Sequence, residues 1–545
     1  MTERCDVAVV GSGFAGSILA RALAVAGRRV VLLERGRHPR FALGESSTPL
    51  AALSLERLAD RYGLPDLRAL AAYGRWRREL PEVAHGLKRG FTFLAHRRGR
   101  PLAASGNVDP PGTGRLLVAA SPTDEVADSH WLRSSVDAYL AARAVEAGAD
   151  LRDEVELTAA EEEPGGLRLS GRWRGRPLDL RAGFVVDGSG AGRFLARHLP
   201  IPPLPDETTA SRPASRPASA LLYGHFEGAL PLAEAAPDLG PPGPYPDERA
   251  AVHHLLDEGW AYALRFDSGR LSAGIELPLD AAGRFEGLEA AADDPAAAFR
   301  RIVERYPTLA AQLGPAVAVE PIRLVPRLQY RLARAAGCRW ILLPSSFAST
   351  GPLYSTGIAW SLLAVERAAA VLERDRPPAA ETLDAYHTVL ALEADWIDRL
   401  VAGGLRARGR FEAFSAWCTL YFAAAAFTES AQRLVTRAAP WHGEAFLGAQ
   451  DRVLREALRS SETGLDAVLA GGAEEADFRR RVVRAVRARD VVGFDLPDRR
   501  GLHPVDLGVL VDRAHLLGLS REQVEAALPR LRGTPEGARQ RPVTT

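Results

Sequence analysis

The chain has 545 residues, of which 47% are hydrophobic and 25% charged, and its formal net charge at pH 7 is +1. This length suits one large α/β unit with appended domains, and the near-zero charge excludes a bulk field that would favour nucleic acid or an anionic membrane. The cysteines at positions 5, 338 and 418 form no C-x-x-C pair, which argues against a metal site or disulfide framework and favours a reducing, cytoplasmic compartment.

The chain opens on a strand, a glycine turn, a helix and a second strand. Residues 5–10 are a β-branched apolar run, and they lead into Gly11-Ser12-Gly13-Phe14-Ala15-Gly16. A helix is predicted over residues 17–26 and a strand over 29–33, which ends in Glu34. This order within about thirty residues is the pattern of a dinucleotide-binding unit. The alternative is a glycine-rich turn in another kind of α/β domain.

Each part of the glycine turn has a physical role in that unit. Gly11 makes the tight turn, Gly13 lets the backbone approach a pyrophosphate, and Gly16 lets the helix pack close to the strand. The helix N-terminus directs N–H groups at the phosphates. Glu34 is placed to accept the ribose hydroxyls.

Further elements follow in the N-terminal half. A polar turn at 44–49 precedes a helix at 50–62, and a strand-like segment spans 85–93. Residues 101–127 are rich in glycine and proline and are predicted to be loop. The remaining expected elements are a helix at 131–148, strands at 154–157 and 184–186, a hairpin at 168–181 and a second glycine turn at 187–193.

The second half is expected to begin with a β-region and to end in helices. Strands at 221–226, 260–265 and 271–277 predict an antiparallel sheet inserted between halves of the nucleotide domain, after a mobile loop at 200–219. Other expected elements are a helix at 299–306, a strand at 340–343, and helices at 358–374, 382–401, 410–438, 448–460 and 474–488, with a frayed tail from 534. Within them the apolar run 411–427 is short for a membrane span and contains Glu412, so a buried helix and no stable membrane insertion are expected.

Lys88 is the only lysine among 69 basic residues. A chain that uses arginine at nearly every basic position would have arginine at position 88 too if arginine served equally well there. A catalytic or substrate-contacting role is therefore favoured over an ordinary surface lysine. Two neighbouring histidines, His253 and His254, suggest a metal pair, but adjacent residues on a strand point to opposite faces, so no metal site is predicted.

Four segments occur in an order that resembles the flavin-dependent halogenase family, within the FAD monooxygenases folded like p-hydroxybenzoate hydroxylase. They are residues 11–16, the turn Gly44-Glu45-Ser46-Ser47-Thr48-Pro49, Lys88 with Gly90 and Phe91, and Pro352-Leu353-Tyr354-Ser355-Thr356-Gly357 before a helix. A fifth segment, residues 259–265, is similar to the family's W-x-W-x-I-P signature. The resemblance covers about residues 1–400.

The resemblance implies an α/β fold with three regions. A Rossmann-like FAD-binding domain is expected from residues 1–200 and 320–375. An inserted antiparallel β-sheet substrate region is expected from 85–130 and 201–320, and a C-terminal helical domain from 376–545.

The resemblance also implies roles for individual residues. Lys88 would lie beyond the flavin and would hydrogen-bond hypohalous acid or carry it as a haloamine, directing halogen onto an electron-rich ring. Residues 44–49 would form a strap beside the flavin. The residues assigned to FAD are Gly11, Gly13, Phe14, Ala15, Gly16, Glu34, Arg35, Gly44, Glu45, Ser46, Ser47, Arg133, Asp187, Gly188, Ser345 and Gly357. Chloride or bromide would bind to Ser355, Thr356 and Gly357, and Trp260 and Tyr262 would lie on the substrate side.

Partners follow from the same resemblance. A separate flavin reductase would supply reduced flavin, and the substrate would be a small molecule or a group bound to a carrier protein. Tyr354 stands where the tryptophan-halogenating branch has a glutamate, which favours a phenol, a pyrrole or a carrier-bound acyl group.

Two departures keep other functions open. Tyr262 replaces the second tryptophan of W-x-W, so an FAD hydroxylase that uses NAD(P)H directly, with Asp187-Gly188 as its pyridine-nucleotide turn, is the first alternative. Pro344-Ser345 replaces the usual Gly-Asp at the flavin ribityl chain, which leaves open an FAD-fold protein that binds an intermediate or carrier domain without catalysis. The serine-rich turn at 345–350 offers no His/Asp arrangement of a hydrolase triad.

Overall fold

The structure is a computed structural model that describes residues 3–102, 114–204, 218–240, 243–280, 283–285, 287–374, 377–435, 444–496 and 501–532. Most of the predicted loop at 200–219 and the whole tail from 534 lie outside the described residues.

The N-terminal sheet is built around the first strand. Its order is β18-β19-β10-β1-β2-β7, with β8 and β9 extending β10 as an antiparallel meander. The pairs β1–β10, β1–β2, β2–β7 and β10–β19 are parallel, because helical connections return the chain to the same edge. The strands are β1 (Glu3–Val10), β2 (Val30–Leu33), β7 (Asp150–Arg152), β8 (Val155–Glu163), β9 (Gly166–Trp173), β10 (Arg176–Asp187), β18 (Ala336–Gly337) and β19 (Trp340–Leu342).

Helices cover this sheet. The first of them, α1 (Phe14–Val25), packs against α5 (Arg133–Glu146) and α12 (Thr356–Leu372). In turn, α12 packs against α2 (Pro49–Tyr62). The apolar run Val7–Val10 and the helix residues Ile18, Leu19 and Leu23 are buried together, which is the reason the unit forms. The shorter helices of this half are α3 (Pro65–Ala69), α4 (Tyr73–Glu79), α6 (Phe194–His198) and α11 (Pro344–Phe347). The predicted Rossmann-like arrangement is confirmed.

A second sheet of nine strands carries the inserted region. Its order is β15-β11-β14-β13-β12-β4-β5-β21, with β16 paired to β11. It is antiparallel apart from the parallel pairs β12–β4 and β21–β5. The strands are β4 (Gly90–Ala95), β5 (Arg115–Ala119), β11 (Ser219–Glu227), β12 (Ala251–Leu255), β13 (Trp260–Arg265), β14 (Leu271–Pro278), β15 (Val317–Ala318), β16 (Arg323–Val325) and β21 (Leu502–His503). Four short helices belong to the same region: α7 (Leu232–Ala235), α8 (Leu288–Asp293), α9 (Pro295–Val303) and α10 (Pro307–Leu313).

Two local predictions differ from the structure here. The expected loop at 101–127 contains β5, whose Leu116 and Leu117 are buried between β4 and β21. The expected single strand at 85–93 is divided, because the chain leaves one sheet and enters another at Gly90. A Cβ on Gly90 would lie 2.1 Å from the Val118 carbonyl oxygen, so only glycine fits the crossing.

The segment before Gly90 forms its own small sheet. In it β3 (His85–Lys88) pairs antiparallel with β6 (Asp128–Trp131), and Lys88 lies opposite Asp128. A second small sheet joins β17 (Tyr330–Arg331) to β20 (Ala348–Ser349).

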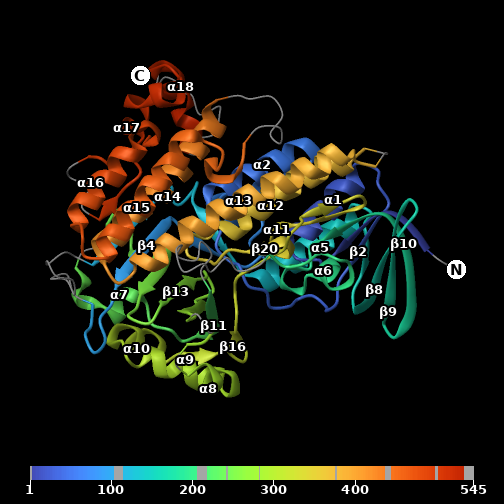
Figure 1. Ribbon diagram of the computed structural model, residues 1–545, viewed down its shortest axis with the longest axis horizontal. Helices are drawn as coiled ribbons and strands as arrows, with labels where there is room; N and C mark the ends of the chain where they lie inside the picture. Colours follow the sequence, from blue (N-terminus) through green and yellow to red (C-terminus); the bar gives the residue numbers. More distant parts are fainter. Residues whose placement is uncertain are drawn as a thin grey trace, which may run out of the picture.

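The C-terminal third is helical, as expected, apart from β21. The long helix α13 (Ala380–Ala407) crosses the molecule between the nucleotide half and the C-terminal helices (Figure 1). The others are α14 (Phe411–Leu434), α15 (Arg452–Leu469), α16 (Glu475–Val486), α17 (Leu507–Asp512) and α18 (Arg521–Leu531). Among the described residues, no helix has the length and apolarity needed to span a membrane. The domain bounds given above stay predictions.

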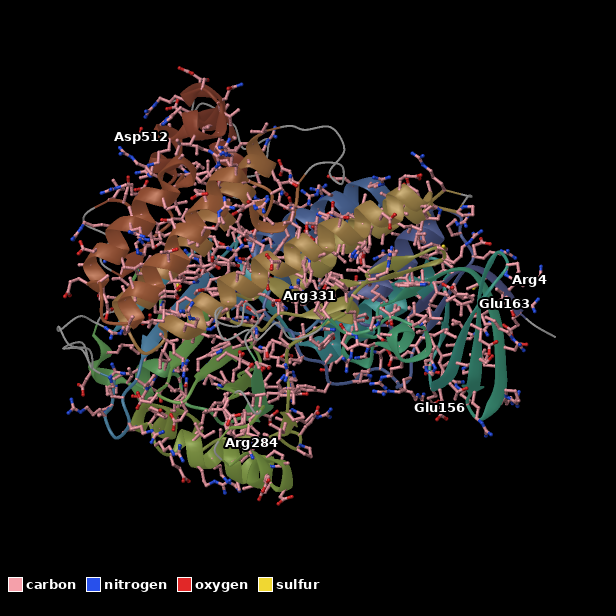
Figure 2. All side chains as sticks on the ribbon, in the orientation of Figure 1. Arg4, Glu156, Glu163, Arg284, Arg331 and Asp512 are labelled. Atoms are coloured by element: carbon pink, nitrogen blue, oxygen red, sulfur yellow. The ribbon has the colours of Figure 1, made fainter. Side chains whose placement is uncertain are left out.

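Charged side chains are mostly peripheral, with paired exceptions inside. Figure 2 shows Arg4 and Glu163 at the outer edge of the molecule and Arg331 near its centre. Arg331 is buried and donates to Asp398 at 2.5 Å.

Glu393 on α13 is one of these buried charges, and it accepts four hydrogen bonds. It accepts from Arg367 at 2.7 and 2.9 Å, from the Trp360 indole at 2.9 Å and from the Phe446 N–H at 2.7 Å. We predict that Glu393→Gln lowers the free energy of unfolding by about 3–5 kcal/mol, because it leaves the Arg367 charge buried without its partner. Urea unfolding checks this against Glu381→Gln at the exposed start of α13; a loss under about 1 kcal/mol would contradict it.

Candidate active site

The glycine turn opens onto a cavity of about 530 Å³, called here the nucleotide cavity. Gly11 and Gly16 are needed for the turn itself: a Cβ on Gly11, whose φ is +101°, would lie 2.5 Å from the Gly188 carbonyl oxygen, and one on Gly16 would lie 2.0 Å from the Gly11 carbonyl oxygen. Gly13 differs, because its Cβ would meet no backbone and would contact only side-chain atoms, of which the Arg133 guanidinium is nearest at 3.4 Å. Of the residues predicted to bind FAD, those that line this cavity are Gly11, Gly13, Phe14, Ala15, Gly16, Glu34, Arg35, Arg133, Gly188 and Ser345.

Glu34 lies at the end of β2 with its carboxylate held from several sides. Its Oε2 accepts from the Ser12 N–H and from Arg40, both at 3.0 Å, and its Oε1 accepts from the Gly36 N–H at 2.9 Å. Burial raises its pKa, but the Arg40 charge and the N–H donors outweigh this and lower the pKa to about 2. Glu34 is therefore an ionised, oriented acceptor beside the glycine turn.

Arg133 connects the first helix with the strap. Its Nε and Nη2 donate to Asp137, each at 2.8 Å, and its Nη1 donates to the Leu43 and Gly44 carbonyls at 2.8 and 3.1 Å. Asp137 also accepts from the Phe14 N–H at 3.1 Å. One buried guanidinium thus fixes the chain that enters the strap.

The carboxylate of Asp187 does not line the nucleotide cavity. It is fully buried and accepts from the Ser189 hydroxyl, the Leu195 N–H and Ser346 Oγ at 2.6, 2.8 and 3.1 Å. Asp187 organises the second glycine turn, and the cavity wall there is made by Gly188 and Ser345. Ser346, which the sequence did not single out, joins the two segments by also accepting from the Gly190 N–H at 2.9 Å.

The strap runs from the nucleotide cavity to a second cavity. Leu43, directly before the strap, lines the nucleotide cavity, whereas Thr48 and Pro49 line the second one. Between these ends Gly44, Glu45, Ser46 and Ser47 line neither cavity. The strap therefore separates the two spaces.

Side chains of the strap are anchored to distant strands. Glu45 accepts from His225 of β11 at 3.0 and 3.1 Å, and both side chains are buried. Ser47 donates to the Ser129 carbonyl of β6 at 2.8 Å, and Ser46 forms a β-bridge with His130. No sequence motif marks His225, because only the pairing of the second sheet brings it to the strap.

Lys88 is fully buried at the far end of the strap. Its Nζ donates to the Ser47 carbonyl at 2.5 Å and lies 4.1 Å from the centroid of the Phe91 ring. Burial lowers the pKa of this ammonium, and the charge of Asp128 opposes the shift. The lysine therefore loses its proton far more readily than a surface lysine does.

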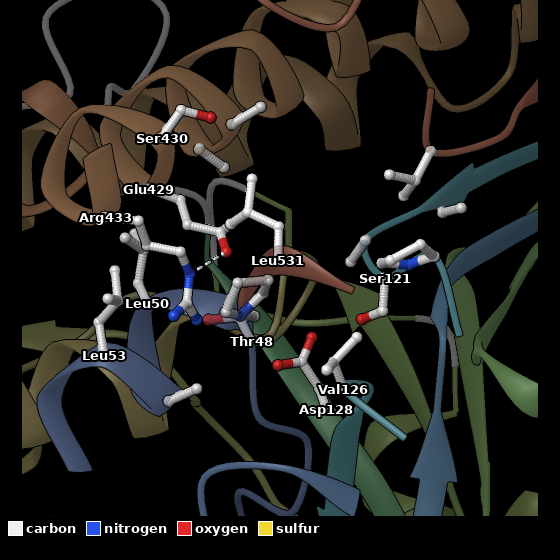
Figure 3. Close-up of a pocket in the computed structure, with 18 of the residues that line it drawn as sticks. Thr48, Leu50, Leu53, Ser121, Val126, Asp128, Glu429, Ser430, Arg433 and Leu531 are labelled. Atoms are coloured by element: carbon white, nitrogen blue, oxygen red, sulfur yellow. Dashed lines mark hydrogen bonds and ion pairs between the residues drawn. The ribbon is translucent and has the colours of Figure 1, made fainter. Parts of the chain in front are cut away.

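The second cavity, called here the large pocket, has a volume of about 800 Å³ (Figure 3). Its walls come from α2, α14, residues 118–128 and the C-terminal segments 503–507 and 527–531. Leu50, Leu53 and Leu531 face it together with Asp128 and the Arg433–Glu429 ion pair. Phe91, under the Lys88 ammonium, also lines it.

Trp260 and Tyr262 lie together in the second sheet, and neither lines either cavity. The Trp260 indole donates to buried Glu276 at 2.8 Å and stacks on His253 at 5.0 Å between ring centroids. His254, on the opposite face, contacts His96 at 2.9 Å, so the adjacent histidines do point apart as expected. The substrate role of Trp260 and Tyr262 stays a prediction.

The predicted halide turn forms the start of α12. Ser355 has a left-handed φ of 53° and makes no side-chain capping hydrogen bond, Thr356 is buried, and Gly357 is exposed. These residues line neither cavity. The preceding Tyr354 stacks on Tyr421 at 4.2 Å, and Tyr421 contacts Phe91, so a chain of aromatic rings leads from the turn to Lys88.

Residues 6–321 match the family of FAD dependent oxidoreductases. The chain belongs to this family. FAD is thus its cofactor, and the nucleotide cavity fits an adenine dinucleotide: open backbone at Gly13, an ionised Glu34 and the Arg133 guanidinium face one space. These residues would hold the pyrophosphate and the ribose.

Relatives with curated names agree with the resemblance inferred from the motifs. The chain is 28% identical over 483 residues to the tetracycline 7-halogenase of Kitasatospora aureofaciens, covering 85% of this chain and 77% of that protein. It is 26% identical to the monodechloroaminopyrrolnitrin halogenase PrnC of Pseudomonas fluorescens, covering 67% of this chain and 61% of that protein. The resemblance to flavin-dependent halogenases is confirmed.

Solved structures share the fold. Halogenase PltM in complex with phloroglucinol and FAD superposes with a TM-score of 0.76 at 20% identity, covering 91% of this chain and 98% of that one. The flavin-dependent brominase Bmp2 gives a TM-score of 0.53 at 17% identity, covering 89% and 99%.

We predict that Gly13→Val weakens FAD binding by about 100-fold or more while the protein still folds, because the added methyl groups fill the cavity without meeting backbone. Gly16→Val is expected to prevent folding, since its Cβ would overlap the Gly11 carbonyl oxygen. Flavin-fluorescence titration and thermal unfolding measure both effects. The control is Gly409→Val, where an added Cβ meets nothing within 4 Å. Unchanged FAD affinity in a folded Gly13→Val protein would contradict the assignment of this cavity to FAD.

Proposed function

We propose that this chain is a flavin-dependent halogenase that acts on an electron-rich phenol larger than a single ring. The observation that carries the proposal is the position of Lys88: a buried amine of lowered pKa, separated from the nucleotide cavity by the strap and adjoining the large pocket through Phe91. A reactive group that has to pass an oxidising equivalent from a flavin to a distant ring needs this arrangement.

Bound FAD, reduced by a separate flavin reductase, supplies with O₂ and chloride or bromide the hypohalous acid that the halogenation consumes. Lys88 then holds the halogen beside the large pocket. Its neutral amine attacks the halogen of HOX, an N–X bond forms as the O–X bond breaks, and the hydroxide released takes the amine proton to give water. Burial favours the neutral amine that this step requires.

The start of α12 supports the proposed halide site. A helix whose first turn has no side-chain cap leaves N–H groups free to receive an anion, and the left-handed Ser355 aims the chain into that turn. Gly357 is exposed and an added Cβ there meets nothing within 4 Å, so this part of the first turn is open to solvent.

The large pocket supports the substrate class. A volume of about 800 Å³ is within the range of pockets that enclose drug-sized ligands, and its walls are largely apolar. A relative named for tetracycline, a fused polycyclic phenol, shares 28% identity over most of the chain. A multi-ring phenol therefore fits better than a pyrrole or a carrier-bound acyl group.

We predict that Lys88→Arg retains the fold and FAD binding but loses at least about 99% of the halogenated product, because a guanidinium stays protonated and cannot form a haloamine. Lys88→Ala is expected to be equally inactive. The assay supplies a flavin reductase, NADH, bromide and a panel of phenols, and it measures brominated product per flavin oxidised, with hydrogen peroxide as the uncoupled product.

Two outcomes would contradict the proposed function. One is undiminished bromination by Lys88→Ala. The other is a bromide-independent hydroxylated product formed by the wild-type enzyme with NADPH alone, which would favour the hydroxylase alternative.

A further inference from the structure

Asp128 is a buried carboxylate at the boundary of the large pocket. It begins β6 and lies directly opposite Lys88 in the antiparallel β3–β6 pair, so both side chains are on the same face of that small sheet. Figure 3 shows its carboxylate directed into the pocket. Its Oδ2 is buried and has no hydrogen-bond partner among the described residues.

Three of the donor groups around Asp128 have other partners, whereas the Tyr245 hydroxyl, on which the Asp128 charge also acts, has none among the described residues. Lys88 donates to the Ser47 carbonyl, and Arg433 pairs with Glu429 at 2.8 Å and with Glu56 at 3.3 Å. The Tyr421 hydroxyl donates to the Tyr354 carbonyl at 2.9 Å. A buried carboxylate oxygen without a donor is unfavourable, so Oδ2 of Asp128 is expected to receive one from a ligand.

We propose that Asp128 binds the hydroxyl group of the phenolic substrate and takes its proton while the ring is halogenated. This inference rests on the proposed halogenase function and names a second catalytic residue for it. A phenol suits the site because a carboxylate accepts hydrogen bonds and a charge-assisted bond from a phenol is strong. Burial raises the pKa of Asp128 to about 7 against the opposing charge of Lys88, so this carboxylate takes up a proton more readily than a surface aspartate does. A pyrrole N–H is a far weaker acid and would gain less.

The step balances as follows. The ring carbon next to the hydroxyl attacks the halogen on Lys88. The C–X bond forms as the N–X bond breaks, and the nitrogen takes a proton from the water released when the haloamine formed, so that lysine leaves as a neutral amine and hydroxide remains. The hydroxyl proton passes to Asp128, which leaves a neutral dienone. The proton on the attacked carbon is then lost to this hydroxide to give water, Asp128 returns its proton to oxygen, and the aromatic ring is restored. The carbon is oxidised by two electrons, and the halogen is reduced.

The position of Asp128 also favours one site of halogenation. Asp128 lines the pocket, and Lys88, opposite it on the paired strand, adjoins the pocket through the Phe91 ring. No ion pair joins the two side chains within the described part of the chain. A hydroxyl held at Asp128 presents the neighbouring ring carbon to Lys88. Halogenation ortho to the bound hydroxyl is expected.

The test compares 2-naphthol with 2-methoxynaphthalene, which has the same rings but no hydroxyl proton. Binding to the FAD-loaded enzyme is measured by calorimetry, and brominated product by mass spectrometry. For Asp128→Asn we expect about tenfold weaker binding of 2-naphthol and about 100-fold less brominated naphthol, with 2-methoxynaphthalene unaffected in both assays. Asp179→Asn, which makes the same charge change in the β9–β10 hairpin, is expected to match the wild type.

Several results would overturn the inference. Equal losses for both naphthalenes would mean that Asp128 acts only on the structure of the pocket, and unchanged naphthol binding and bromination would mean that it does not contact the hydroxyl. Weaker naphthol binding with unchanged turnover would show that Asp128 binds the hydroxyl group but does not take its proton. If the wild-type enzyme brominates neither compound, the proposed function fails. The difference in binding between the two compounds still decides whether Asp128 receives the hydroxyl.

Discussion

The Lys88 ammonium lies where water does not reach it, and its Nζ donates to the Ser47 carbonyl at 2.5 Å. A buried cation of this kind is costly unless its surroundings are fixed. The strap carbonyl, the Phe91 ring beneath Nζ and Asp128 on the facing strand supply that fixed environment. Moving any of them changes both the position of the amine and its readiness to lose a proton, so the proposed chemistry depends on this contact.

The strap owes its position to parts of the chain that are far apart in sequence. Arg133 of α5 holds the Leu43 and Gly44 carbonyls, and His225 of β11 holds Glu45. The strap is thus held by both the nucleotide half and the inserted sheet. The same segment runs from the nucleotide cavity to the large pocket. In the proposed reaction, the two halves of the fold would therefore set the distance over which the halogen has to travel.

Sequence patterns predicted the elements that follow from local chemistry, such as the glycine turn, the parallel strands and the long helices. They missed β5, whose short apolar run follows a stretch rich in glycine and proline, and the break at Gly90, which depends on the approach of Val118. Asp128 and His225 carry no local signal, since strand pairing brings them to the site over sequence separations that a motif does not contain. The single lysine drew attention to Lys88 because every other basic residue of the pair Lys and Arg is arginine, and its catalytic role stays a prediction.

The central claim is that flavin and substrate occupy different cavities, with the strap and Lys88 between them. A crystal structure of the FAD-loaded enzyme soaked with 2-naphthol tests it most directly. The expected result is a flavin in the nucleotide cavity, on one side of residues 44–49, and the naphthol rings in the large pocket beside Lys88. Naphthol stacked on the flavin within a single cavity would contradict the claim, because that geometry serves direct oxygen transfer and leaves Lys88 without a reaction to perform.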